Sequence, residues 1–157
     1  MERQADQRDE TELERLDRNT VELVSELRVA ATGVQVLFAF LLIVPFNNRF
    51  SRVSSFERYD YFVTLLCVAV AAVLLIAPSV HHRLLFRLGE KAFIVTIGNR
   101  LAIAAAAFLC VGLTGILVLL SSFIFGGVTA AVVGACAACL VIGVWFALPL
   151  IHRRGHR

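Results

Sequence analysis

Two cysteines, Cys136 and Cys139, have the Cys-x-x-Cys spacing typical of redox and metal sites. Such sites need a neighbouring histidine, acid or positive charge that stabilises the thiolate. Here both thiols lie in the middle of an uncharged apolar run, as do Cys67 and Cys110 in their own segments. We therefore expect four free thiols that act as small packing residues, and no metal or other cofactor.

The four histidines lie beside arginines, His81 and His82 in one basic segment and His152 and His156 at the C-terminus. A metal site would need more converging ligands and an acid. We instead expect this end of the protein to contact anionic lipid headgroups on the cytoplasmic side. The residues assigned to that contact are His81, His82, Arg83, Arg87, Lys91, Arg100, Arg153 and Arg154.

Proton- or cation-driven transport usually needs an ionisable group within the membrane. The apolar segments contain no Asp, Glu, Lys, Arg or His away from their ends. The polar residues left as intramembrane candidates are Thr32, Gln35, Asn99 and Thr114. We expect Gln35 to form a hydrogen bond across helices, with Thr96 or Asn99 as its partner. A path lined by these residues in a small oligomeric channel is the alternative.

Four segments are long and apolar enough to span a bilayer, at about residues 29–46, 61–80, 101–120 and 128–151. The last two come from 51 residues without a charge, Leu101 to Ile151, which is too long for one span. Ser121–Ser122 and Gly126–Gly127 mark the turn between them. The fold class is therefore all-α, an integral membrane four-helix bundle over residues 29–151, followed by a basic tail at 152–157.

The N-terminal arm differs from the rest of the chain. Residues 1–9 are polar throughout and predict a disordered tail, whereas leucines recur at helical spacing over residues 10–28. This second segment predicts a cytoplasmic amphipathic helix whose stripe comprises Leu13, Leu16, Thr20, Leu23 and Leu27. Two packing arrangements stay open: the stripe packs on the protein's own membrane domain, or it forms a seam between subunits.

Charge sets the predicted topology. With four spans, both termini and the segment 81–100 share one side of the membrane, which carries 12 of the 15 Lys and Arg residues. The positive-inside rule then places both termini in the cytoplasm of a plasma-membrane protein. The net charge of +3 is spread unevenly, because residues 1–28 carry nine acids and five basic residues. This division argues against nucleic-acid binding, which needs a continuous basic surface.

Small residues recur every four positions in the last span, in one row of Ala130, Gly134 and Ala138 and another of Ala131, Ala135, Cys139 and Gly143. Such faces let helix backbones approach closely. We expect one row to pack within the chain and one to remain for a neighbour, either a second copy or another membrane protein. No nucleophile elbow, phosphate loop or carboxylate pair is present in the sequence, so we expect no enzymatic activity.

Three stretches, Glu14–Asn19, Glu26–Phe46 and Ile76–Phe86, the last followed by Asn99–Arg100–Leu101, resemble one family. It comprises small four-span membrane proteins of unknown function from high-GC Gram-positive bacteria. The resemblance covers roughly residues 10–150 and implies no substrate and no catalytic residue. Some members bear the label sodium:proton antiporter, so the resemblance implies cation–proton antiport as one form of the transport alternative. From the residues themselves, the favoured function is that of a non-enzymatic scaffold or accessory subunit that acts through helix–helix association.

Overall fold

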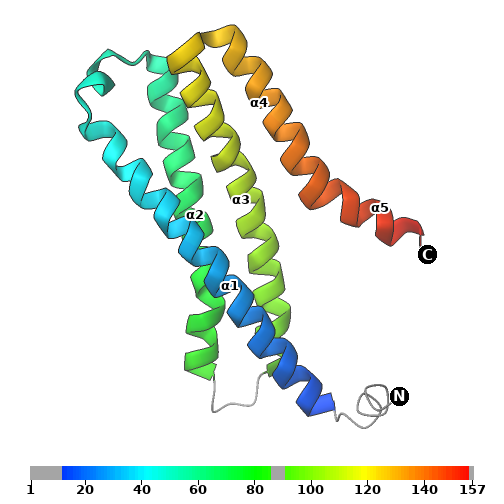
Figure 1. Ribbon diagram of the computed structural model, residues 1–157. Coiled ribbons are helices and arrows are strands. Elements are labelled where there is room, and N and C mark those ends of the chain that lie inside the picture. Colours follow the sequence, from blue (N-terminus) through cyan, green and yellow to red (C-terminus); the bar gives the residue numbers. More distant parts are fainter. Residues whose placement is uncertain (1–11, 86–90, 156–157) are drawn as a thin grey trace, which may run out of the picture.

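The structure is a computed structural model that describes residues 12–85 and 91–155, apart from some side chains within these ranges. These residues are helical almost throughout (Figure 1). The helices are α1 (Glu12–Ile43), α2 (Ser55–Leu85), α3 (Lys91–Phe125), α4 (Gly127–Ile142) and α5 (Leu148–Gly155). Short 3-10 turns, η2 (Val44–Phe46) and η3 (Asn48–Arg52), join α1 to α2, and one π-helical turn, η4 (Gly143–Ala147), joins α4 to α5.

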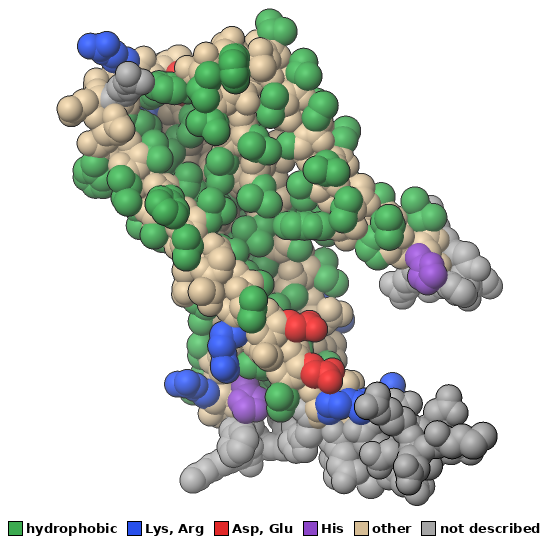
Figure 2. Space-filling view, in the orientation of Figure 1, with side chains coloured by type: hydrophobic (Ala, Val, Ile, Leu, Met, Phe, Trp, Pro, Cys, Tyr) green, Lys and Arg blue, Asp and Glu red, His purple; other side chains and the backbone are tan. Residues whose placement is uncertain are grey.

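Four stretches are long and apolar enough to cross a membrane: Val21–Phe46, Ser55–Leu84, Ile94–Phe125 and Gly127–His152. Figure 2 shows hydrophobic side chains over the middle of the molecule and charged side chains toward its two ends. Because an apolar surface of this kind is stable only in lipid, the chain is a multi-pass membrane protein. The prediction of an all-α fold with four membrane-length helices is confirmed.

Helices α1, α2 and α3 form the packed core of the molecule. The core cluster that joins them consists of Leu27, Ala31, Val34 and Leu41 from α1, Tyr61, Val68, Ala71 and Leu75 from α2, and Ala105 from α3. The hydroxyl of Tyr61 donates a hydrogen bond of 3.0 Å to the carbonyl of Leu41, which ties the start of α2 to the end of α1.

Glycines let α2 and α3 approach closely. A β-carbon at Gly112 would lie 2.8 Å from Val68 Cγ2, and one at Gly115 would overlap Thr64 Oγ1. Further along the same interface, Gly98 lies against Pro78. The small residues of α3 therefore serve contact within the chain.

Helix α4 packs mainly on α3 and leans away from α1 and α2 (Figure 1). Its buried residues are Ala130, Gly134 and Ala137, and residues 138–152 include no buried residue. Of the two predicted rows of small residues, Ala131, Ala135 and Cys139 are exposed. The molecule thus differs from a compact four-helix bundle, because only the small residues near the turn let α4 approach α3.

The segment predicted as a 20-residue basic loop, 81–100, is mostly helical. Helix α2 continues through Pro78 to Leu85, and α3 already begins at Lys91. Pro78 is fully buried against α3, and a proline inside a membrane helix is tolerated when neighbouring helices support the freed backbone groups. The predicted spans 61–80 and 101–120 are accordingly shorter than the helices that contain them.

Helix α1 runs without a break from Glu12 through the predicted boundary at Arg28 to Ile43. Within the described residues there is therefore no amphipathic helix separate from the first span. Leu27 is buried and Leu23 is half-buried, and both pack against the chain's own core. The side chains of Leu13, Leu16 and Thr20, like the tail 1–9, lie outside the description, so the full stripe stays a prediction.

Candidate functional site

A cluster of polar side chains lies between the beginning of α2 and the end of α3. Glu57 Oε2 accepts hydrogen bonds from the backbone N–H of Ser54 at 2.7 Å and from its hydroxyl at 2.9 Å. The N–H of Glu57 donates to Ser54 Oγ at 3.2 Å, which completes a capping box at the start of the helix. Glu57 Oε1 accepts a further bond of 3.1 Å from the hydroxyl of Ser122, so this carboxylate joins α2 to α3.

Asp60 lies on the same side of α2, one turn further along. One carboxylate oxygen, Oδ1, would lie 3.4 Å from a β-carbon at Gly115, which places Asp60 against α3. The other oxygen, Oδ2, is buried and has no hydrogen-bond partner among the described residues. Thr64, only 1% exposed, follows another turn deeper and also faces Gly115. These residues place a carboxyl group roughly 8 Å inside the membrane-length helix that begins at Ser55.

An isolated carboxylate is costly to bury, and a carboxyl group that holds a proton or a cation is less costly to bury. The arrangement is therefore suited to binding one or the other. Asp60 was not among the residues predicted from the sequence, because residues 47–60 lie between the predicted spans 29–46 and 61–80. The signal that could have found it is Ser54-x-x-Glu57, because a capping box there starts the helix early and directs Glu57, Asp60 and Thr64 to one face.

The four polar residues predicted from the sequence do not converge. Thr32 and Gln35 are exposed on α1, and the Thr32 hydroxyl donates to the carbonyl of Arg28 at 3.0 Å. Asn99 lies in a groove between α1 and α3 that does not include Gln35, so the expected hydrogen bond between these two side chains is not formed.

Thr114 lies in a third place. It is one turn from Val118, the residue that a β-carbon at Gly134 of α4 would touch, and so faces α4. Its hydroxyl is buried, without a partner among the described residues.

Only some of the predicted headgroup residues have side chains in the part of the chain that the structure describes. His81 and His82 are half-buried at the end of α2, whereas Arg83 and Arg100 are exposed. Arg87 falls in the undescribed segment 86–90, and the side chains of Lys91, Arg153 and Arg154 are also outside the described part. Arg83 and Arg100 are thus the two predicted headgroup contacts with exposed, described side chains.

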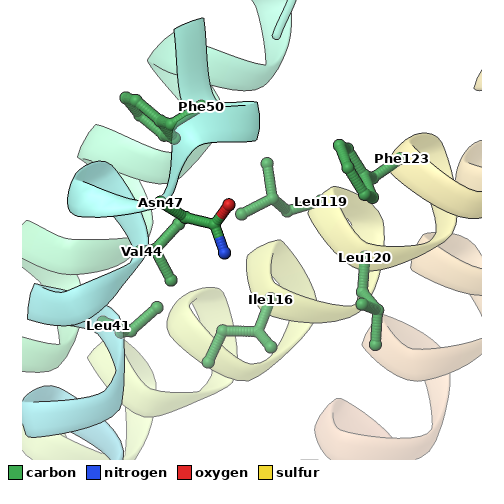
Figure 3. A pocket seen from close by; sticks show the side chains of 8 residues that line it. All are labelled: Leu41, Val44, Asn47, Phe50, Ile116, Leu119, Leu120 and Phe123. Atoms are coloured by element: carbon green, nitrogen blue, oxygen red, sulfur yellow. The ribbon is translucent and has the colours of Figure 1, made fainter. Parts of the chain in front are cut away.

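An apolar pocket of about 420 Å³ lies at the end of the core opposite Arg83 and Arg100, where α1 passes into η2 and η3 beside α3 (Figure 3). Seven of its lining side chains are apolar, and the amide of Asn47 points into the space between the two walls. The pocket contains no side chain suited to acid–base chemistry. Its lining residues are Leu41, Val44, Asn47, Phe50, Ile116, Leu119, Leu120 and Phe123.

A model of a protein family matches residues 9–149 of the chain; it is described as a family of unknown function, DUF6328. No curated protein and no solved structure matches the chain. The family match spans most of the 157 residues and includes all four membrane-length helices almost completely. On this evidence the chain belongs to the family of unknown function DUF6328.

Proposed function

We propose that this protein is a non-enzymatic scaffold or accessory subunit that acts by lateral helix–helix association in the membrane. The observation that carries the proposal is the packing of α4. The stretch Gly127–His152 that begins with α4 is long enough to cross the bilayer, yet residues 138–152 are mostly exposed and include no fully buried residue. A membrane helix with small residues on an unpacked face is suited to a close contact with another helix.

Helix α1 offers a second free surface of similar character. Thr32, Gly33 and Gln35 are all exposed, and no atom of another segment lies near the position of a β-carbon at Gly33. A glutamine that faces lipid leaves its amide without partners, so a neighbouring helix that hydrogen-bonds to it would be favoured. The partner is either a second copy of the chain or another membrane protein.

The charge distribution supports a plasma-membrane protein with both termini in the cytoplasm. Helices α1 and α3 run in one direction and α2 and α4 in the other (Figure 1). Four crossings would therefore put the N-terminal segment, the basic segment 81–100 and the basic C-terminal segment on one side. Exposed Arg83 and Arg100 are then available to anionic headgroups on that side.

Cysteine cross-linking in native membranes tests the association. Cys136 and Cys139 are exposed on α4, whereas Cys110 is buried in the core. Single-cysteine variants would be expressed at the natural level and treated with an oxidant and with a bis-maleimide. We expect a covalent adduct from the Cys139 or Cys136 variant and none from the matched Cys110 variant, because cross-links form only between closely placed thiols.

Native mass spectrometry of the unmodified chain in lipid identifies the partner. A doubled mass indicates a second copy, and a heteromeric mass indicates a different protein. The proposal is wrong if the chain is monomeric at natural expression and neither exposed cysteine yields an adduct.

A second candidate function, transport of a proton, an ion or a small solute, is favoured by one observation. Asp60 has a buried carboxylate oxygen without a partner at the α2–α3 interface, and cation–proton antiport needs a carboxyl group of this kind. The resemblance to a family with members labelled as sodium:proton antiporters also supports this candidate.

Reconstitution distinguishes the two functions. Proteoliposomes would be given a sodium or proton gradient, and the flux would be compared between the natural chain, Asp60→Asn and the control Arg52→Gln, which changes an exposed charged residue outside the cluster. Transport predicts a flux that Asp60→Asn abolishes and Arg52→Gln preserves. Flux equal to that of empty liposomes would eliminate this candidate.

A further inference from the structure

A polar groove separates α1 from α3 at the end of the molecule where α1 begins. It has a volume of about 510 Å³, and its two walls come from different helices. The α1 wall consists of Asn19, Glu22, Leu23 and Glu26, and the α3 wall consists of Val95, Thr96, Asn99 and Arg100. Asn99 and Arg100 were described above as single residues, but neither the polar cluster nor the proposed helix–helix association uses the groove as a binding site.

The two walls carry opposite charges that do not meet. Within the described residues, neither Glu26 nor Arg100 forms an ion pair, although both line the same space. Glu22 is within 3.9 Å of Arg18, in a pair whose side chains are more than half exposed. Surface pairs of this kind contribute little, so the Glu22 carboxylate also remains available to a ligand.

The groove lies at the boundary between charged and apolar surface. Figure 2 shows acidic and basic side chains at this end of the molecule, below the hydrophobic band. The α3 membrane-length stretch begins at Ile94 and the α1 stretch begins at Val21, so the groove spans the first turns of both. Leu23 and Val95 add apolar side chains to its walls. Such a position is where a phospholipid headgroup meets its acyl chains.

We propose that this groove binds the ammonium–phosphate headgroup of an aminophospholipid from the leaflet on this side. A primary ammonium has three N–H donors, which match the carboxylates of Glu26 and Glu22. A phosphate accepts paired hydrogen bonds from a guanidinium, which matches Arg100, and Asn99 adds a side-chain amide. The acidic wall disfavours a headgroup that carries only negative charge, and a trimethylated ammonium has no N–H to donate.

The test measures lipid selectivity with the full chain. Native mass spectrometry in detergent would follow the binding of phosphatidylethanolamine, phosphatidylcholine and phosphatidylglycerol, offered in equal amounts. We expect phosphatidylethanolamine to bind several-fold more tightly than the other two. Glu26→Gln should weaken its binding about tenfold, which corresponds to one charge-assisted hydrogen bond, while phosphatidylglycerol binding stays unchanged or rises. Arg100→Gln should weaken the binding of both lipids.

Arg52→Gln is the matched control, because it removes an exposed arginine at the opposite end of the core and should leave selectivity unchanged. The unfolding midpoint of each variant shows whether it is folded. The proposal is overturned if folded Glu26→Gln keeps the natural preference, or if phosphatidylcholine binds as well as phosphatidylethanolamine. Soluble phosphoethanolamine that binds as tightly as the lipid would reassign the groove to a free zwitterion and so overturn the assignment to a lipid.

Discussion

Gly115 determines how closely α2 and α3 approach at the polar cluster. Any β-carbon at this position would overlap Thr64 Oγ1 and would lie 3.4 Å from Asp60 Oδ1, in van der Waals contact. One turn earlier, Gly112 receives Val68 in the same way. Membrane helices associate through close packing, because lipid gives them no hydrophobic drive to do so. These two glycines therefore contribute to stability because the absence of a side chain lets α2 and α3 pack closely.

Gly115→Ala should destabilise the protein by about 1–3 kcal/mol, the usual cost of overpacking. Unfolding in lipid nanodiscs, followed by the fluorescence of Trp145, measures the change. Gly33→Ala is the matched control, because an added methyl group there meets nothing within 4 Å. It should leave stability unchanged or raise it by up to about 1 kcal/mol through helix propensity. Equal losses in the two variants would show that α2 and α3 do not pack at Gly115.

Glu57 should contribute to stability through two separate partners. Replacing it with alanine removes the two bonds that its carboxylate accepts from Ser54, which are the side-chain half of the capping box, and also the bond from Ser122. Each such bond typically contributes about 0.5–1.5 kcal/mol. A double-mutant cycle of Glu57→Ala and Ser122→Ala isolates the second effect, with an expected coupling of about 0.5–1.5 kcal/mol. A coupling of zero would mean that the contact between the two helices contributes nothing.

The sequence was a poor guide to individual polar residues. Thr32 and Gln35 were selected because their neighbours are apolar, yet both side chains are exposed. Asp60 was assigned to a loop because its neighbours are polar, yet one of its oxygens is buried. Hydropathy averages over all faces of a helix, whereas burial depends on the one face that meets a neighbour. That face is fixed by the helix start at Ser54–Glu57 and by the glycines of the opposite helix.

At the level of whole helices, α1 shows why the predicted element boundary at residue 28 is absent. The predicted amphipathic segment and the predicted first span are joined without a proline or glycine between them. Helix hydrogen bonds continue across such a junction, because each added residue extends an existing helix at little cost. The buried residues Leu27, Ala31 and Val34 then form one continuous face against α2 and α3.

Inserting one alanine between Arg28 and Val29 tests this continuity. The insertion would rotate the two parts of α1 by about 100° relative to each other and so separate Leu23 and Leu27 from the face of Ala31 and Val34. We expect a marked fall in the unfolding midpoint. The control, one alanine between Gly126 and Gly127, lengthens an exposed turn and should be tolerated. An independent helix over residues 10–28 would instead make the first insertion silent.

The number of membrane-length helices followed from hydropathy alone, but their ends did not. Segment 81–100 resembled a loop because it carries Arg83, Arg87, Lys91 and Arg100. Long basic side chains extend toward water from the ends of membrane helices, so charge marks the interface rather than the end of the helix. The turn between α3 and α4 was easier to predict. Its backbone needs a positive φ, 94° at Gly126, and glycine, which adopts this conformation without strain, is visible in the sequence at that position.

For the whole molecule, the distribution of basic residues and the alternating helices support one topology. With four crossings, the three arginines of segment 47–60 would lie on one side of the membrane and the other twelve Lys and Arg residues on the opposite side. Translocation of Lys and Arg is disfavoured, so the side with twelve should stay in the cytoplasm. The acids of residues 1–28 do not alter this expectation, because the rule depends on Lys and Arg.

Cysteine labelling of intact cells tests this topology. In a variant that lacks the four natural cysteines, Ser51→Cys in η3 and Gly127→Cys at the start of α4 should react with a membrane-impermeant maleimide outside the cell. A cysteine added after Arg157 should react only after lysis, because the charge rule keeps the basic tail inside. Labelling of the tail and of Ser51→Cys from the same side would mean an even number of crossings between them. One of the three membrane-length helices that follow Ser51 would then lie along the membrane or outside it, and α4, which packs least on the rest of the chain, would be the first to re-examine.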